Sequence, residues 1–396
     1  MAEFFSFFII LLAALSFSVL FARFHLPWVM ALIIGGIVIG PHGFGWLEIN
    51  ETVDFFGQIG LVFLMFMAGL ETPISKLKSN GKEVAILVAF NGIIPFFVGL
   101  GIGFYFDYGI TASLLLGIIF ISSSVAIIIP SLQTNKLLKK PLGRSILAAT
   151  VVLDVSSLIF LSILLQTTDP VTSLPLPIFY GLLIIVFILL RRAIKKMHRF
   201  FHFMGLRKKD VFEQEFRAIV VILIGTVILF GLFGLHPIIA GFFAGLVLSE
   251  SITSDVLKQK LHAISYGVFI PVFFIIIGAN TDLGVFLRAT DAILLTIVVV
   301  IGSLFSKYAS GYVGGRINGF TQRQSALIAS ATIPKLSTTL AVVFLGFTLG
   351  IFDDKMVTAL IILSVTTTFI APLLINYFAK GITFKEARVK PKRPFS

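Results

Sequence analysis

Three ionisable residues stand inside otherwise apolar stretches of this sequence. Asp154 lies near the middle of LAATVVLDVSSLIFLSILL, and Lys307 and Lys335 lie in similar stretches further along. Ionisable side chains within a membrane are costly, so they line a cavity, pair with one another or mark an ion pathway. We interpret Asp154 as an ion-binding and proton-carrying residue, with a structural hydrogen bond between helices as the alternative. Lys307 and Lys335 are candidate core basic residues, and capping of helix ends is the alternative for Lys335.

The chemistry that suits a buried carboxyl group is exchange of a proton for a cation. A low-dielectric site favours the protonated form of the acid, whereas Na⁺ and K⁺ prefer oxygen ligands, as other hard cations do. We therefore predict that Asp154 is also the metal site, for a monovalent cation. The oxygen atoms that could complete its coordination belong to six hydroxyl residues, Ser122, Ser123, Ser124, Thr150, Ser156 and Ser157.

Competition for one site would couple the two ions. If the protein reorients only when the site is loaded, the result is obligatory exchange. One carboxylate that carries one proton in one direction and one cation in the other predicts electroneutral exchange. Release of a proton from Lys307 would make the exchange electrogenic.

The composition requires a membrane to hold these residues. The chain is 57% hydrophobic and 13% charged, with a mean hydropathy of +1.05, which predicts an all-α polytopic membrane protein. Runs long enough to cross a bilayer as helices number about thirteen. They are 4–22, 27–45, 54–70, 84–106, 111–133, 144–166, 177–195, 216–234, 237–249, 264–280, 290–315, 322–348 and 356–379.

The basic residues predict the orientation of these spans. Most of the 31 Lys and Arg fall in loops that follow odd-numbered spans or in the tail. Since basic loops remain cytoplasmic, we expect a plasma-membrane protein with its N-terminus outside and its C-terminus in the cytoplasm. The net charge of +12 is thus a topology signal, and its spread over many short loops argues against nucleic-acid binding.

The sequence also contains a weak internal repeat. With a shift of 209 residues, LPWVMALIIGGIVIGP (26–41) aligns with LHPIIAGFFAGLVLSE (235–250), and LMFMAGLET (64–72) aligns with FFIIIGANT (273–281). The two copies are an odd number of spans apart, so the second copy is inverted. Inverted repeats are typical of secondary transporters, whose binding sites lie where helices are interrupted.

Two polar stretches predict those interruptions. IFISSSVAIIIPSLQ (119–133) contains three serines and Pro130, and ASATIPKLSTTLAVV (329–343) contains Pro334, Ser337 and Thr338. Proline removes a helical N–H group, and unwound backbone is tolerated in a membrane only against protein or a watery cavity. The alternative is a tight helix interface of small residues. Interrupted helices would have dipole ends inside the membrane. Asp154 could compensate the positive N-terminal ends, and Lys307 or Lys335 the negative C-terminal ends.

Several of these segments together resemble a known family. LPWVMALIIGGIVIGP, GLVFLMFMAGLE, LDVSSLIFL, GLHPIIAGFFAGLVLS and VFIPVFFIIIGANTDL are similar, in order, to monovalent cation:proton antiporters of the second type, the group of bacterial sodium/proton antiporters and of the membrane part of potassium-efflux systems. The resemblance implies thirteen helices in two inverted repeats with crossed broken helices, a homodimer in the bilayer, and elevator-type movement. Asp154 matches the family's ion-binding aspartate, and Lys307 matches its core lysine.

The resemblance also implies a division into domains. The dimerisation scaffold is residues 1–80 and 210–289, and the mobile ion-translocation core is residues 81–170 and 290–380. Residues 171–209 form a linker helix and basic loop, and residues 381–396 form a basic tail. Two positions depart from the family pattern: Leu153 stands where many members have Asp or Asn, and PKLS (334–337) replaces Pro-Arg-Gly-Glu. Ion selectivity and stoichiometry therefore stay open.

Other classes fit the sequence less well. A channel needs a continuous polar pore, and an enzyme is disfavoured because no histidine has metal-ligand spacing to a carboxylate. No cofactor is expected beyond the transported ions, and a regulatory subunit is left open. A sodium-coupled symporter of an organic anion on the same architecture is the main alternative; it needs a pocket larger than an ion.

Overall fold

The computed structural model is all-helical throughout the part of the chain that it describes. That part comprises residues 2–23, 28–71, 81–138, 140–168, 213–232, 235–249 and 254–380, with residues 178, 180, 181, 188, 192 and 252. Within these residues, nine spans are long and apolar enough to cross a membrane, and three further apolar helices are shorter. The predicted all-α polytopic membrane fold is therefore confirmed.

The helices follow the predicted spans closely. In chain order they are α1 (Ala2–Ala22), α2 (Trp28–Ile39), α3 (Glu51–Leu70), α4 (Gly81–Tyr105), α5 (Ile110–Ile121), α6 (Val125–Thr134), α7 (Pro141–Thr168), α9 (Gln214–Leu232), α10 (Pro237–Ser249), α11 (Asp255–Ile264), a π-helical turn (Ser265–Phe269), α12 (Ile270–Ala279), α13 (Val285–Arg288), α14 (Thr290–Ile317), α15 (Gln322–Ala331), α16 (Ser337–Thr348) and α17 (Asp354–Ala379).

Two of the predicted spans differ from the described helices or lie largely outside them. The span predicted at 264–280 begins earlier, at Asp255, because α11 is a polar, amphipathic helix that continues into the apolar part through the π-helical turn. Most of the span predicted at 177–195 lies outside the described residues, as do the basic loop before residue 210 and the tail 381–396.

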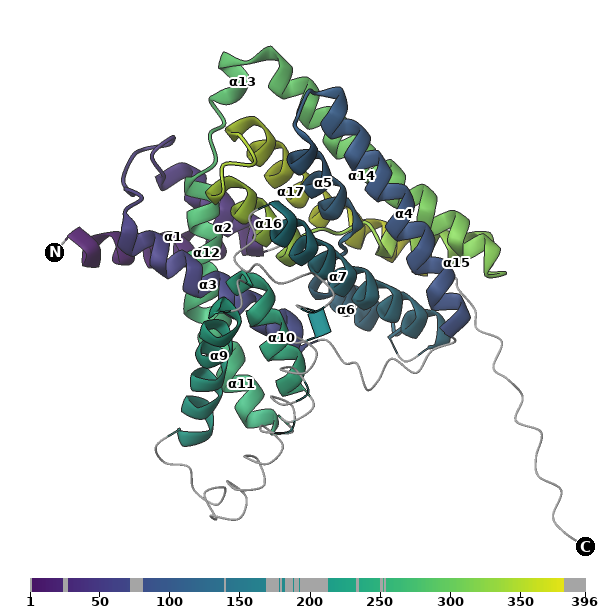
Figure 1. Cartoon of the computed structure of the whole chain (residues 1–396), viewed down its shortest axis with the longest axis horizontal. Coiled ribbons are helices and arrows are strands. Elements are labelled where there is room, and N and C mark those ends of the chain that lie inside the picture. The colour runs from purple at the N-terminus through teal and green to yellow at the C-terminus, as the bar shows by residue number, and fades with distance from the viewer. Residues whose placement is uncertain are drawn as a thin grey trace, which may run out of the picture.

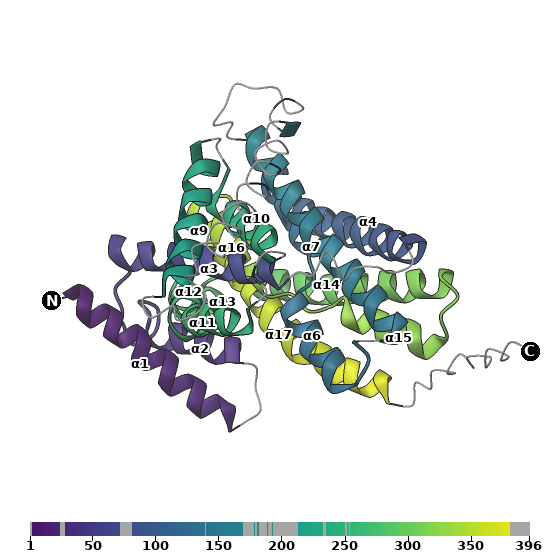
Figure 2. The ribbon, with the colours of Figure 1, turned by 90° about the horizontal axis from the view of Figure 1, so that it is seen from below.

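The helices form two groups that lie mostly on opposite sides of the molecule in both ribbon views, with α16 at the boundary between them (Figures 1 and 2). We call α1–α3 and α9–α12 the paired-helix group, because α2 packs on α12 and α3 packs on α10. We call α4–α7 and α14–α17 the crossover group, because its two interrupted helices cross. Helix α16 of the crossover group also contacts α3.

Close helix contacts in the paired-helix group reproduce the internal repeat. A methyl group on Gly36 of α2 would overlap the Ile275 carbonyl of α12, and a methyl group on Gly245 of α10 would overlap the Phe66 carbonyl of α3. A shift of 209 residues converts the first pair into the second. The same relation joins a second set, Ile33 with Gly278 and Phe242 with Gly69. The two repeats therefore pack against each other through equivalent glycine contacts.

We expect Gly245→Ala to destabilise the protein, because an added methyl group must separate α10 from the α3 backbone. Overpacking of this kind costs about 1–3 kcal/mol. Gly225→Ala in α9 is the matched control, since nothing lies within 4 Å of its added methyl group and alanine favours a helix. Thermal unfolding in detergent measures both. A melting temperature for Gly245→Ala that equals or exceeds that of Gly225→Ala would contradict the close packing.

One end of the crossover group collects basic loops. Asn318 Nδ2 donates a hydrogen bond to Glu83 O, Ser145 Oγ donates to Glu83 Oε2, and Arg323 Nε donates to Phe378 O. These bonds place the starts of α4, α7 and α15 beside the ends of α14 and α17. The basic residues at this end include Lys82, Lys140, Arg144, Arg316 and Arg323.

Candidate functional site

The two interrupted helices meet at their breaks. Residues 122–124 separate α5 from α6, and residues 332–336 separate α15 from α16. Ser124 N donates to Pro334 O over 2.7 Å, and Ser123 Oγ donates to Thr332 O over 2.8 Å. Ser123 and Thr332 are 209 positions apart, the offset of the repeat. The unwound backbone groups thus satisfy one another at a crossing point of the two repeats.

Asp154 faces this crossing from the middle of α7. Its side chain is 5% exposed and lines a cavity of about 30 Å³ together with Val125 and Ala126 of α6 and Ser337 of α16. The residues before α6 and α16 make no side-chain cap bond to either helix, so neither cap residue occupies the first N–H groups of these helices. Helix N-termini attract anions, and two of them therefore stabilise a carboxylate at this position.

Several oxygen atoms at the crossing lack hydrogen-bond partners among the described residues. They are Asp154 Oδ1, Ser124 Oγ and Thr338 Oγ1, and the Thr338 side chain neighbours the Asp154 carboxyl group. Buried polar atoms are normally paired, so unpaired ones call for an explanation such as an ion or water. Carboxylate and hydroxyl oxygens suit a hard cation.

Lys307 approaches the crossing from α14 and is fully buried. Its Nζ donates to Asn91 O at 3.3 Å, to Ile121 O and to Ser123 Oγ at 3.1 Å. Backbone carbonyls therefore occupy the place of the acidic partner that Leu153 cannot provide. Lys307 is also within electrostatic range of Asp154.

Lys335 lies in the second break and is also fully buried. Its Nζ donates to three carbonyl oxygens, those of Ile119, Phe120 and Ser122, at 2.9–3.0 Å. These carbonyls form the C-terminal end of α5, which is the negative end of the helix dipole. Lys335 therefore caps α5, the role that the sequence offered as the alternative for this residue.

The remaining candidate residues are arranged differently. Thr150 Oγ1 donates to Ile146 O, and Ser157 Oγ donates to Asp154 O, so both hydroxyl protons are used within α7. Ser122 Oγ pairs with Thr339 Oγ1 at 2.9 Å. Pro334 lies in its break, but Pro130 lies within α6, beyond the first break.

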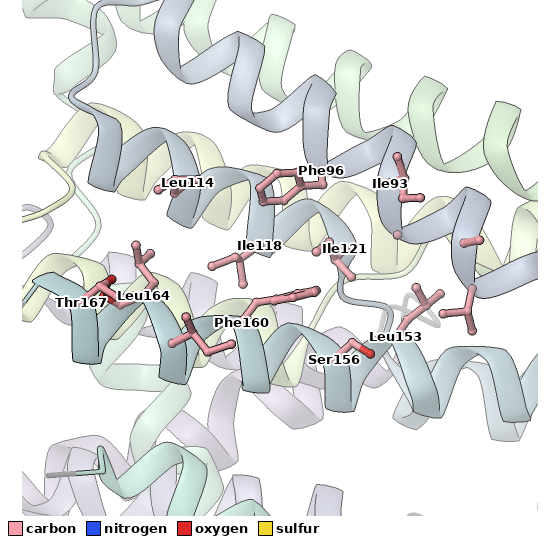
Figure 3. Close-up of a pocket in the computed structure, with 14 residues that line it drawn as sticks. Ile93, Phe96, Leu114, Ile118, Ile121, Leu153, Ser156, Phe160, Leu164 and Thr167 are labelled. Atoms are coloured by element: carbon pink, nitrogen blue, oxygen red, sulfur yellow. Dashed lines mark hydrogen bonds between the residues drawn. The ribbon is translucent and has the colours of Figure 1, made fainter. Parts of the chain in front are cut away.

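Ser156 does not line the Asp154 cavity. It faces a separate pocket of about 490 Å³ between α4, α5 and α7, whose lining is almost entirely apolar and includes Leu153, Phe96 and Phe160 (Figure 3). An apolar pocket offers few ligands to a bare ion. We therefore leave Ser156 out of the ion site.

Residues 7–381 match the family model described as "Sodium/hydrogen exchanger, transmembrane". The chain belongs to the sodium/hydrogen exchanger family. Members of this family are transporters, so the chain is a transporter and not an enzyme. The resemblance found in the sequence is confirmed at the level of this family, and the finer assignment to the second type with its potassium-efflux systems stays a proposal.

Relatives within the sodium/hydrogen exchanger family align along nearly the whole chain. A protein named probable Na(+)/H(+) antiporter 3 of Methanocaldococcus jannaschii is 32% identical over 391 residues, which cover 96% of this chain and 98% of that protein. The Na(+)/H(+)-K(+) antiporter GerN of Bacillus cereus is 29% identical, over 94% of this chain and 95% of that protein. The solved sodium proton antiporter MjNhaP1 of Methanocaldococcus jannaschii superposes with a TM-score of 0.70 at 16% identity, over 96% of this chain and 98% of that one. This last likeness supports the fold.

Proposed function

We propose that the chain is a cation:proton antiporter of the plasma membrane, in which H⁺ and Na⁺ or K⁺ compete for Asp154. The observation that carries the proposal is the unpaired, buried Oδ1 of Asp154, which lines a small cavity at two helix starts. A carboxylate held this way binds either ion and cannot bind both. The names of the relatives, which are Na(+)/H(+) antiporters, support the same exchange.

The cavity supports movement of one helix group past the other. Leu64, Tyr266 and Phe274 line it from the paired-helix group, and Asp154 and Ser337 line it from the crossover group. We propose that residues 81–170 and 290–380 move as the ion-carrying core, and that residues 1–80 and 210–289 form the scaffold and the contact of a homodimer. Movement of the core would expose Asp154 to each side of the membrane in turn.

The basic end of the crossover group supports an orientation. Short loops rich in Lys and Arg remain in the cytoplasm, so we assign that end to the cytoplasm. The C-terminus is then cytoplasmic, and an odd number of spans leaves the N-terminus outside.

The alternative of an organic-anion symporter is weaker. The cavity beside Asp154 has a volume of about 30 Å³, enough for one or two water molecules and too small for an organic anion. Within the family, we propose the second type, in line with GerN, whose name includes both Na(+) and K(+).

We expect the exchange to be electroneutral, because Lys307 is held by carbonyl and hydroxyl acceptors rather than by an acid that exchanges with it. Purified protein in proteoliposomes, with a pH gradient and a clamped membrane potential, tests this. If each cycle moved one net charge, a change of 100 mV in the membrane potential would be worth about 2.3 kcal/mol. That energy would shift the equilibrium Na⁺ gradient roughly fifty-fold. We expect a shift of less than about twofold, and a fifty-fold shift would show electrogenic exchange. Absence of any cation:proton exchange would refute the proposed function itself.

A further inference from the structure

A proline lies in the middle of α4, one turn from the contact between this helix and Lys307. Pro95 is buried, and α4 continues as a helix on both sides of it. Proline has no backbone N–H group, and its ring crowds the carbonyl group four residues earlier in the helix. In α4 that carbonyl group belongs to Asn91. Asn91 O therefore lacks the donor that a helix would supply from position 95.

The ammonium group of Lys307 supplies the missing donor. Lys307 Nζ donates to Asn91 O at 3.3 Å, and its other two acceptors are Ile121 O and Ser123 Oγ. Ile121 O also lacks a helical donor, because α5 ends at this residue. An ammonium group has three N–H donors and no acceptor, so these three oxygen atoms use all of its donors.

Side-chain hydrogen bonds hold Asn91 beside Lys307. Asn91 Nδ2 donates to Leu87 O at 3.1 Å within α4. Ser310 Oγ, on α14, lies 3.1 Å from Asn91 Oδ1 and 3.0 Å from Lys307 O and can donate to either. Asn91 and Ser310 are both fully buried, and α4 packs along α14 (Figure 1). Both helices therefore fix the position of Asn91 O relative to the ammonium group.

The carboxyl group nearest to this ammonium group is not one of its acceptors in the described part of the chain. Lys307 is within electrostatic range of Asp154, and Asp154 Oδ1 has no hydrogen-bond partner among the described residues. A carboxylate is a stronger acceptor for an ammonium group than an uncharged oxygen is. The three donors of Lys307 nevertheless bind uncharged oxygens. This arrangement leaves the unpaired oxygen of Asp154 open.

We propose that Pro95 is a positioning residue of the ion site: it frees Asn91 O to bind the Lys307 ammonium group, which is thereby kept from pairing with Asp154. The proposal rests on the proposed function, in which Asp154 binds the transported ions, and adds what keeps its binding oxygen open. Pro95 acts through Lys307 and has no contact with the ion.

Replacement of Pro95 by alanine reverses this arrangement. Alanine brings an N–H group to position 95, which binds Asn91 O in the ordinary helical pattern. One ammonium donor of Lys307 then loses its acceptor, and the unpaired Oδ1 of Asp154 attracts that donor most strongly. An ion pair between Lys307 and Asp154 would compete with the transported cation. Saturating cation displaces a competitor, so the maximal rate should be retained.

The test compares Pro95→Ala with Gly101→Ala in proteoliposomes at one fixed alkaline pH. Gly101→Ala also favours the helical state of α4, but nothing lies within 4 Å of its added methyl group. We expect Pro95→Ala to raise the half-saturating Na⁺ concentration at least threefold, with a maximal rate within a factor of two of the control. Its melting temperature should not fall below that of Gly101→Ala by more than a few degrees, because a helical hydrogen bond replaces the lost ammonium bond.

Ser310→Ala tests the same link from α14. It removes the hydroxyl group beside Asn91 Oδ1, so we expect it to raise the half-saturating Na⁺ concentration by a smaller factor. Equal half-saturating concentrations for Pro95→Ala and Gly101→Ala would overturn the positioning role, and so would a lower maximal rate without a change in half-saturation. If Pro95→Ala does not fold, Ser310→Ala decides: wild-type Na⁺ dependence overturns the role. Retained exchange in Asp154→Asn would instead overturn the proposed function.

Discussion

Cation-dependent proton movement is expected to fall at least a hundredfold when Asp154 is replaced by Asn. The amide has nearly the same shape as the carboxyl group, but it carries no charge and does not bind a proton at physiological pH. Both halves of the exchange therefore lose their site together. Dissipation of a pH gradient by Na⁺, K⁺ and Li⁺ in everted membrane vesicles measures the loss for each cation.

The same substitution is expected to leave the protein folded. Burial of a charge opposes folding unless the charge is paired, and Asp154 Oδ1 has no hydrogen-bond partner among the described residues. Removal of the charge therefore relieves a cost, while it gives up the attraction of two helix N-termini, which is worth about 0.3–2 kcal/mol each. We expect a melting temperature close to that of the wild type. High activity loss with unchanged stability is the signature of a binding residue.

Asp107→Asn is the matched control. Asp107 is exposed and has a positive φ of 58°, a conformation that asparagine also tolerates. We expect this variant to exchange ions at the wild-type rate. If Asp154→Asn retained exchange at the rate of Asp107→Asn, Asp154 would have no part in transport.

The charged residues of the candidate site could be proposed from the sequence because their signal is local. A carboxylate or ammonium group within an apolar run is conspicuous from its neighbours alone, which identified Asp154, Lys307 and Lys335. Span positions were predictable for the same reason. The family resemblance then implied that the two interrupted helices belong to one group.

The position of the first break was harder to predict. Proline was the strongest local signal, yet Pro130 lies inside α6, and the break falls at the serines before it. A break at residues 122–124 is stabilised by partners from the other repeat, such as Pro334 O and Thr332 O, which no local pattern reveals. Pro130 lies in the middle of α6, where it removes one helical hydrogen bond without ending the helix.

The set of acceptors around Lys307 is likewise a tertiary feature. In the sequence, Asn91 and Pro95 are an amide and a proline within an apolar span, far along the chain from Lys307. They meet the lysine because α4 packs along α14. The signal that could have suggested Asn91 is its place four residues before Pro95, which leaves its carbonyl group without a helical donor.

The two lysines divide the end of α5 between them. Lys335 binds the carbonyls of Ile119, Phe120 and Ser122, and Lys307 binds that of Ile121. A helix that ends inside a membrane has no water for its last carbonyls. Two ammonium groups supply the missing donors, and their positive charges lie within electrostatic range of Asp154. The same two ammonium groups therefore cap the end of α5 and balance the charge of Asp154.

Lys335→Met is expected to destabilise the protein by about 3–5 kcal/mol. Methionine keeps the length of the side chain but leaves three buried carbonyl oxygens without a donor, and each unsatisfied group costs about 1–3 kcal/mol. Loss of a buried charge offsets part of this cost. Thermal unfolding in detergent measures the difference. Lys355→Met, at an exposed end of the molecule where the lysine pairs with Asp291, is the control and should leave the melting temperature nearly unchanged.

Lys335→Arg separates capping from a role in the ion pathway. The guanidinium group keeps a positive charge and five donors, so it should recover part of the lost stability although its larger head must fit a filled space. If Lys335 serves chiefly as the α5 cap, total exchange activity should follow the amount of folded protein across Lys335→Met and Lys335→Arg, and activity per folded molecule should stay at the wild-type level. Wild-type stability of Lys335→Met together with lost exchange would contradict this, and would place the Lys335 charge among the groups that the transported ions sense directly.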